Sequence, residues 1–307
     1  MPPSPGGESR LALGAGFLCY LIWGFVPLFF QAIGHLGVTP WEILAERIAW
    51  SVPAAAAFVL LARQGGHALA VLRQPKVLAW LLLSALLIAA NWVVFIWAVN
   101  SGRLLEASLG YYINPLVSMA AGALLFRERL DRIALAAIGL ALAGVVVQTL
   151  ALGHLPWVSL VLALSFGFYG IVRKQVAAEA QTGLLVETLL VSVVAVPYIV
   201  WLQARGQGHL GDPVATAWLV ASGPVTALPL VLFSWAARRI PLSLMGFMQF
   251  LSPTISFVIG LSQGEAFTPA RAASFTLIWA GAAVFLFGAW RRTRNLPSPQ
   301  AIKAAAE

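Results

Sequence analysis

Three of the charged side chains inside the apolar segments of this sequence are candidates for chemistry. Glu46 and Arg47 lie roughly 8 Å inside the segment 41–62, and Glu187 begins the segment 183–203. A charge at membrane depth is costly, so each is a candidate for gating, for binding a cationic group or for carrying a proton. The structural alternative, for Glu46 and Arg47 and for Glu187 alike, is an ion pair or an interfacial position.

A second polar group lies in the stretch LEASLGYYINP, residues 105–115. Ser108 and Tyr112 follow helical spacing and share one face of a predicted helix. Hydroxyl and aromatic groups on such a face can line a pocket, although ordinary helix packing uses the same face. Glu106 follows Arg103 by one turn, and we interpret it as a structural anchor, because the helix dipole favours an anion in the first turn.

We extend these candidates to the polar and aromatic side chains of the other apolar segments. The predicted cavity-lining residues are Tyr20, Trp23, Asn91, Ser108, Tyr111, Tyr112, Asn114, Tyr169, Gln249 and Phe250. Each polar member has an alternative role, which is a hydrogen bond to a neighbouring helix.

Other chemistries lack the residues that they need. Cys19 is the only cysteine, and the four histidines fall far apart in connecting segments, so we predict neither a metal site nor a cofactor. The sequence has no GxxxxGK[ST] motif for nucleotide phosphates. Ser222 lies in a protease-like VASGP turn, but no apolar segment holds a histidine to act as its base. We therefore expect a protein that is not an enzyme.

The composition defines the elements that must position these residues. The chain is 60% apolar and 10% charged, whereas an average soluble domain is about 25% charged. This favours an all-α integral membrane protein in a lipid bilayer. Nucleic acid binding is not expected, because the basic residues lie between apolar runs and form no patch. At about 20 residues per span, we predict ten spans near 11–33, 41–62, 77–100, 104–126, 133–150, 156–172, 183–203, 214–237, 241–261 and 270–290.

The basic residues predict an orientation. Ten spans place both termini on one side, and 15 of the 19 Lys and Arg residues fall on that side. Only Arg103 and Arg205 fall in the loops of the opposite side. Because basic loops stay cytoplasmic, we predict cytoplasmic termini, residues 1–10 and a disordered tail 291–307.

The two halves of the sequence resemble each other at a shift near 138. WAVNSGRLLEASLGYYINPL (97–116) aligns with WAARRIPLSLMGFMQFLSPT (235–254), and Ala143-Gly144 aligns with Ala280-Gly281. We predict two five-span repeats, 11–150 and 156–290, of which the second enters the membrane from the opposite side. Inverted repeats are typical of secondary transporters, with the binding site near the midplane where the halves meet.

The aligned prolines predict two hinges. Pro115 and Pro253 lie inside the fourth and ninth spans, where proline removes a helix hydrogen bond. Gly110 and Gly246 are further hinge candidates. The alternative is that both prolines form packing kinks without a role in gating.

Several long blocks resemble a known family. They include LEASLGYYINPLVSMAAGALLFRERLDR, SFGFYGIVRKQV, GLLVETLL, TALPLVLFSWAARRIPLSLMGFMQFLSPT and GEAFTPAR. Over about residues 11–290 the chain is similar to the bacterial RarD family, in the EamA branch of the drug/metabolite transporter (DMT) superfamily. The resemblance implies two EamA repeats and an inner-membrane transporter whose spans one, three, four, six, eight and nine surround a central cavity. RarD proteins carry the label chloramphenicol-sensitive protein, and relatives export amino acids, nucleobases and drugs.

We therefore expect a secondary transporter that exports small metabolites or drugs, amino-acid-like or amphenicol-like, by alternating access. The expected partners are a small-molecule substrate and the bilayer, in a monomer or a homodimer of the bacterial inner membrane. An intramembrane enzyme and a membrane sensor without transport are the alternatives.

Overall fold

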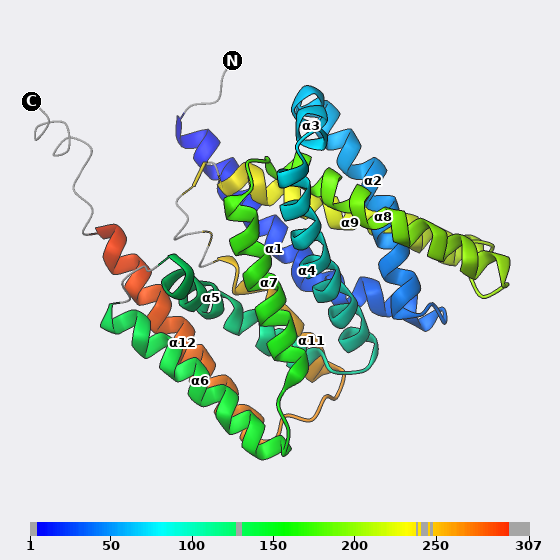
Figure 1. The fold of residues 1–307 in the computed structure, drawn as a ribbon. Helices are drawn as coiled ribbons and strands as arrows, with labels where there is room; N and C mark the ends of the chain where they lie inside the picture. Colours follow the sequence, from blue (N-terminus) through cyan, green and yellow to red (C-terminus); the bar gives the residue numbers. More distant parts are fainter. Residues whose placement is uncertain (1–4, 127–130, 238, 241–244, 246–247, 295–307) are drawn as a thin grey trace, which may run out of the picture.

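The computed structural model describes residues 5–126, 131–237, 239–240, 245 and 248–294. These residues form helices and connecting turns, with no strand among them. In chain order the helices are α1 (Pro5–His35), α2 (Pro40–Leu61), α3 (Gly65–Leu72), α4 (Pro75–Asn100), α5 (Leu104–Phe126), α6 (Arg132–Leu152), α7 (Trp157–Gln175), α8 (Ala180–Ala204), α9 (Pro213–Ala237), α11 (Leu251–Ser262) and α12 (Pro269–Arg294). Figure 1 shows them as one bundle.

The prediction of an all-helical membrane protein is confirmed. Seven of the described helices, α1, α2, α4, α6, α8, α9 and α12, are long and apolar enough to cross a membrane. Most of α7 and the whole of α11 are shorter apolar helices. Large apolar side chains point outward at mid-helix, for example Val193 at 72% exposed and Leu142 at 60%. In a bilayer such side chains contact lipid instead of water.

Local sequence sets several helix ends. Thr39 caps α2 by accepting the Glu42 N–H at 3.3 Å, with Pro40 at the first helical position. Asp131 caps α6 in the same way through the Ala134 N–H at 2.7 Å. At its other end α6 stops at Gly153, whose φ of 70° is left-handed.

The predicted ninth span, 241–261, is not a continuous helix over its described part. Residues 249 and 250 form a turn, and α11 begins at Leu251 with Phe250 as its N-cap. Pro253 therefore lies in the first helical turn, where its missing N–H removes no helix hydrogen bond. The prediction that Pro253 lies deep inside a helix is wrong. Pro115, in contrast, lies inside α5 as predicted.

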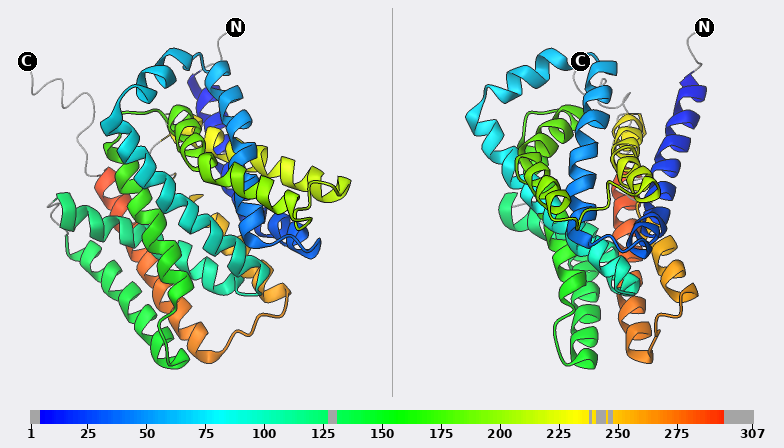
Figure 2. Two further views of the ribbon diagram at one scale, coloured as in Figure 1. Left: turned by 45° about the vertical axis from the view of Figure 1, so that its right-hand side comes forward. Right: turned by 90° about the vertical axis from the view of Figure 1, so that its right-hand side faces the viewer.

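The helices of the two sequence halves pack in matching pairs. The fifth and tenth predicted spans, α6 and α12, pack against each other. The second and seventh, α2 and α8, do the same. Six further contacts form three exchanged pairs: α5 with α7 and α11 with α1, α4 with α7 and α9 with α1, and α4 with α8 and α9 with α2. Figure 2 shows α6 and α12 side by side in both views, at the edge of the bundle.

Small residues allow the close approach of α6 and α12. A Cβ added to Gly144 would lie 2.9 Å from the Ser274 carbonyl oxygen, and the Ser274 hydroxyl donates to the Gly144 carbonyl oxygen at 2.8 Å. A Cβ added to Gly281 would lie 2.9 Å from the Ala137 carbonyl oxygen. The two glycines are thus each pressed against the backbone of the opposite helix, as is common between membrane helices.

Candidate functional site

A cavity of about 550 Å³ lies inside the bundle. Its walls come from eight helices, α1, α2, α4, α5, α7, α8, α9 and α11, whereas α6 and α12 contribute no lining residue. This volume lies within the roughly 300–1,000 Å³ that is usual for small-molecule sites.

The cavity extends toward the side of the bundle at which α1 begins and α12 ends. In the right-hand view of Figure 2, α1 begins at the top and α12 runs upward. It reaches Ala180 and Gln181 at the start of α8, Arg173 near the end of α7 and Phe233 near the end of α9. The opposite ends of these helices, from 192 to 204 in α8 and from 213 to 225 in α9, contribute no lining residue. The cavity is therefore asymmetric along the bundle.

Most of the predicted lining residues lie on this cavity. Those on its wall are Tyr20, Trp23, Asn91, Tyr111, Asn114, Tyr169 and Gln249. They come from α1, α4, α5, α7 and the turn before α11, so the fold brings together residues that are up to 229 positions apart in the sequence.

Ser108, Tyr112 and Phe250 are not on the wall, which corrects the predicted helix face. The Ser108 hydroxyl donates to the Leu105 carbonyl oxygen within α5. Tyr112 stacks on Phe250 at 6.1 Å between ring centroids, and its hydroxyl lies 2.6 Å from that of Thr254. The cavity face of α5 is therefore the neighbouring one, which carries Tyr111 and Asn114.

Asn91 joins three helices beside the cavity. Its amide nitrogen donates to the Leu162 carbonyl oxygen and to the Ser165 hydroxyl of α7, both at 3.0 Å. Its amide oxygen accepts from the Tyr111 hydroxyl of α5 at 3.0 Å. Asn91 thus fixes α4 against α5 and α7. Asn114 is different, because its buried amide oxygen has no hydrogen-bond partner among the described residues.

Arg47 of α2 lies on the cavity wall and is only 7% exposed. Its Nε donates to the Thr226 hydroxyl of α9 at 2.8 Å. Its guanidinium carbon lies 4.0 Å from the centroid of the Trp92 ring and 5.0 Å from that of Phe30. No carboxylate of the described residues lies within 4 Å of it, so the predicted alternative of an ion pair with Glu46 is wrong for this conformation.

Glu187 also lies on the wall, and its residue is 2% exposed. It accepts hydrogen bonds from Ser84 of α4 and, at 3.4 Å, from the Tyr169 hydroxyl of α7. One of its oxygens is 3.5 Å from Nε of Arg173. Glu187 is therefore part of an ion pair inside the bundle, not at its surface.

Glu46 has a different environment from Glu187. It is 1% exposed and does not lie on the wall. One carboxylate oxygen accepts from the Trp50 ring N–H at 3.0 Å, and the other has no hydrogen-bond partner in the part of the chain that the structure describes.

The hinge candidates have separate positions. Pro253 lies on the cavity wall, whereas Pro115 is buried in α5 away from it. A Cβ on Gly110 would lie 2.7 Å from the Ser159 carbonyl oxygen, so this glycine permits the contact of α5 with α7. Gly246 lies outside the described residues.

Sequence reasoning missed Arg173, which it counted as a cytoplasmic loop residue. The last turns of α7 carry it into the cavity wall. The sequence analysis also did not place the second and seventh spans around the cavity, although these spans supply Arg47 and Glu187 to its wall. The signal that was available was the presence of a charge in each of these spans.

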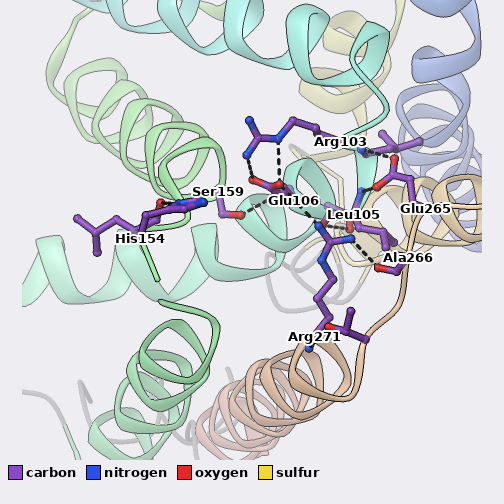
Figure 3. A network of polar contacts seen from close by, with 12 residues as sticks. Arg103, Leu105, Glu106, His154, Ser159, Glu265, Ala266 and Arg271 are labelled. Atoms are coloured by element: carbon purple, nitrogen blue, oxygen red, sulfur yellow. Dashed lines mark hydrogen bonds and ion pairs between the residues drawn. The ribbon is translucent and has the colours of Figure 1, made fainter. Parts of the chain in front are cut away.

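The helix ends on the opposite side from the cavity are joined by a polar network (Figure 3). Glu265, which lies between α11 and α12, accepts the Leu104 and Leu105 backbone N–H groups at 2.5 and 2.9 Å and so caps α5. Burial raises the pKa of the Glu265 carboxyl above its usual value, although the two N–H donors and nearby Arg271 oppose this shift.

Glu106 has the anchoring position that the sequence predicted, with more partners. It forms a two-bond ion pair with Arg103 at 2.8 and 2.9 Å and lies 3.8 Å from Arg271 of α12. Its carbonyl oxygen accepts from the Ser159 hydroxyl of α7 at 2.7 Å (Figure 3). The network therefore links both sequence halves.

No group of three or more His, Cys, Asp and Glu side chains suited to a metal ion occurs within the described residues. The only cysteine, Cys19, is buried as a free thiol.

Comparison with known proteins shows which family the chain is similar to. The model of the EamA-like transporter family matches residues 10–150. An uncharacterized transporter of Pseudomonas aeruginosa is 42% identical over 92% of this chain and 96% of its own length. The protein RarD of Streptomyces exfoliatus is 41% identical over 97% of this chain and 95% of its own length. One solved crystal structure has a similar fold, with a TM-score of 0.55 and 22% identity over 92% of this chain and 98% of the other.

Proposed function

The chain belongs to the EamA-like transporter family, among its RarD members, and we propose that it is a secondary transporter that moves small molecules through its central cavity by alternating access. The cavity is the observation on which this rests. It is enclosed by both sequence halves, and α1, α2, α4 and α5 of the first half face α7, α8, α9 and α11 of the second.

The proposed architecture is ten spans in two inverted repeats, 11–150 and 156–290. The exchanged pairs of helix contacts support a pseudo-two-fold relation between the halves. The reciprocal packing of Gly144 and Gly281 supports it at the level of single residues. An odd number of spans in each half makes the second repeat inverted. Such halves can exchange conformations around a fixed site, which is the basis of alternating access.

We assign both termini to the cytoplasm of a bacterial cell and the cavity to the inner membrane. The excess of Lys and Arg on the side of the termini supports this orientation. The cavity extends toward that side, while the opposite side is closed by contacts such as those of Glu265 with α5 and of Gln31 with Gln263 at 2.9 Å. In this orientation a substrate enters from the cytoplasm, so export is the proposed direction.

The proposed substrates are small metabolites or drugs, amino-acid-like or amphenicol-like. Aromatic rings of Trp23, Trp92 and Phe166 and the charged groups of Arg47 and Glu187 offer contacts for both kinds. Pro253, on the wall at the helix break, and Pro115, inside α5, are the proposed sites of bending between conformations.

Two experiments test the proposal. Thermal unfolding of the purified protein is measured across a library of amino acids, nucleosides and amphenicols, because a ligand of the folded state raises apparent stability. Flux of the stabilising compounds is then measured in proteoliposomes with and without a pH gradient. Absence of flux for the whole library contradicts the proposal. It favours a membrane sensor if compounds still bind, and chemical conversion of a bound compound favours an intramembrane enzyme.

A further inference from the structure

Arg47 is a buried cation whose hydrogen-bonding capacity is largely unused. A guanidinium has five N–H donors, and only Nε of Arg47 has an acceptor, the Thr226 hydroxyl. That hydroxyl donates its own hydrogen to the Ser222 carbonyl oxygen at 2.8 Å, so its position is fixed. The two terminal nitrogens of Arg47 have no acceptor among the described residues.

The nearest carboxylate in the sequence does not neutralise this cation. Adjacent residues of a helix point about 100° apart, and Glu46 binds Trp50 one turn further along α2. Glu42, one turn before Glu46, binds the ring and backbone of His209. The acidic side of α2 therefore faces away from the cavity wall on which Arg47 lies.

The carboxylate on the wall is already paired. Glu187 accepts from Ser84 and Tyr169 and forms an ion pair with Arg173. Among the described residues, the ionised lining side chains are thus two arginines and one glutamate, and one positive charge remains on Arg47. Its contact with the Trp92 ring at 4.0 Å compensates part of its lost hydration, but supplies no acceptor for the terminal N–H groups.

Resting on the proposed function, we propose that Arg47 is the binding site for a carboxylate of the transported molecule. The two terminal nitrogens of an arginine match the two oxygens of a carboxylate in a bidentate pair. A single unpaired arginine suits a monoanion, since the second arginine of the wall is held by Glu187. Aromatic and apolar residues form most of the remaining wall, including Trp92, Phe95 and Phe166. The substrate class is therefore a small organic carboxylate with an apolar or aromatic body.

The test compares pairs of compounds in which the carboxylate of one is replaced by a neutral amide in the other. Phenylpropionate is compared with phenylpropanamide, and L-phenylalanine with L-phenylalaninamide, by thermal unfolding of the purified full chain over a range of ligand concentrations. The variants are Arg47→Gln and Arg47→Lys. Arg205→Gln is the matched control, because Arg205 is exposed at the end of α8 and packs on Trp201 away from the cavity.

The carboxylates are expected to stabilise the wild type, and their amides to stabilise it at least tenfold more weakly in apparent affinity. Arg47→Gln should weaken the carboxylates about tenfold to hundredfold, as expected for a lost charged hydrogen bond. Arg47→Lys should retain part of the affinity, and Arg205→Gln all of it. If Arg47→Gln does not fold, the comparison of acid with amide in the wild type decides alone.

Equal binding of acids and amides, or binding by neither, overturns the assignment of Arg47. Flux of neutral compounds, unchanged in Arg47→Gln, would overturn it while leaving the transporter function intact. Absence of flux for every compound, neutral or anionic, instead removes the proposed function. The two failures are therefore distinguishable.

Discussion

The close packing of α6 on α12 predicts which glycines accept a methyl group. In Gly144→Ala the new Cβ would lie 2.7 Å from Cγ1 of Ile278 and 2.9 Å from the Ser274 carbonyl oxygen. The second of these is a backbone atom, which can move only with its helix. Gly139 lies on the same helix, is exposed, and has no atom within 4 Å of an added Cβ. Gly139→Ala is therefore the matched control.

The expected size of the effect follows from this comparison. Replacing glycine by alanine inside a helix contributes about 1 kcal/mol of stability in both variants, so this gain cancels. Overpacking a close contact costs about 1–3 kcal/mol. The free energy of unfolding of Gly144→Ala should therefore be lower than that of Gly139→Ala by about 1–3 kcal/mol.

The assay is reversible denaturation of each purified variant in detergent micelles, followed by helicity and tryptophan fluorescence. Gly281→Ala should show a penalty of similar size, because its Cβ would lie 2.9 Å from the Ala137 carbonyl oxygen. Equal stability of Gly144→Ala and Gly139→Ala would refute the close contact. A penalty in Gly144→Ala without one in Gly281→Ala would refute the reciprocal packing of the two halves.

Three further predictions concern polar groups. Asn91→Leu should lower the free energy of unfolding by about 1–2 kcal/mol, since it leaves the Tyr111 hydroxyl without its acceptor; unchanged stability in the same denaturation assay would show that this link between helices is dispensable. Glu187→Gln should destabilise the fold by about 3–5 kcal/mol because Arg173 loses its counter-ion. Adding Arg173→Met should restore part of the lost stability. A double variant that is no more stable than Glu187→Gln would rule out coupling of the pair. Burial raises the pKa of Glu265 in the folded state, so the folded state binds this proton more tightly than the unfolded state. The free energy of unfolding should therefore fall as the pH rises from the usual glutamate pKa through the raised one. Denaturation over a pH series measures this slope, and the same slope in Glu265→Gln would exclude Glu265 as its origin.

The sequence predicted most helices because an apolar run of about 20 residues has few alternatives in a bilayer. It failed at the ninth span, because a mostly apolar segment there predicts one helix, whereas residues 249 and 250 form a turn. Composition cannot reveal that turn, since the residues around it remain apolar. Helix α3 was also missed, because its eight residues, Gly65–Leu72, are too few for a span.

The candidate site was predictable in residue type but not in direction. Tyr111 and Tyr112 are adjacent, so they point about 100° apart, and only the positions of α7, α11 and α12 decide which one meets the cavity. Periodicity selected the face of Tyr112, which packs on Phe250. Arg173 was missed because helix ends cannot be placed from sequence to within one turn.

Blocking the cavity tests the central claim, that this space is the transport pathway, most directly. Gly170 lies on the cavity wall, and no atom of the described residues lies within 4 Å of an added Cβ, so Gly170→Trp places an indole in the space of the cavity. Gly139→Trp places the same side chain on the exposed face of α6. Both proteins are reconstituted at matched folded fractions, and counterflow of a stabilising compound is measured in proteoliposomes. The expected result is loss of flux in Gly170→Trp and wild-type flux in Gly139→Trp; wild-type flux in Gly170→Trp would contradict the central claim.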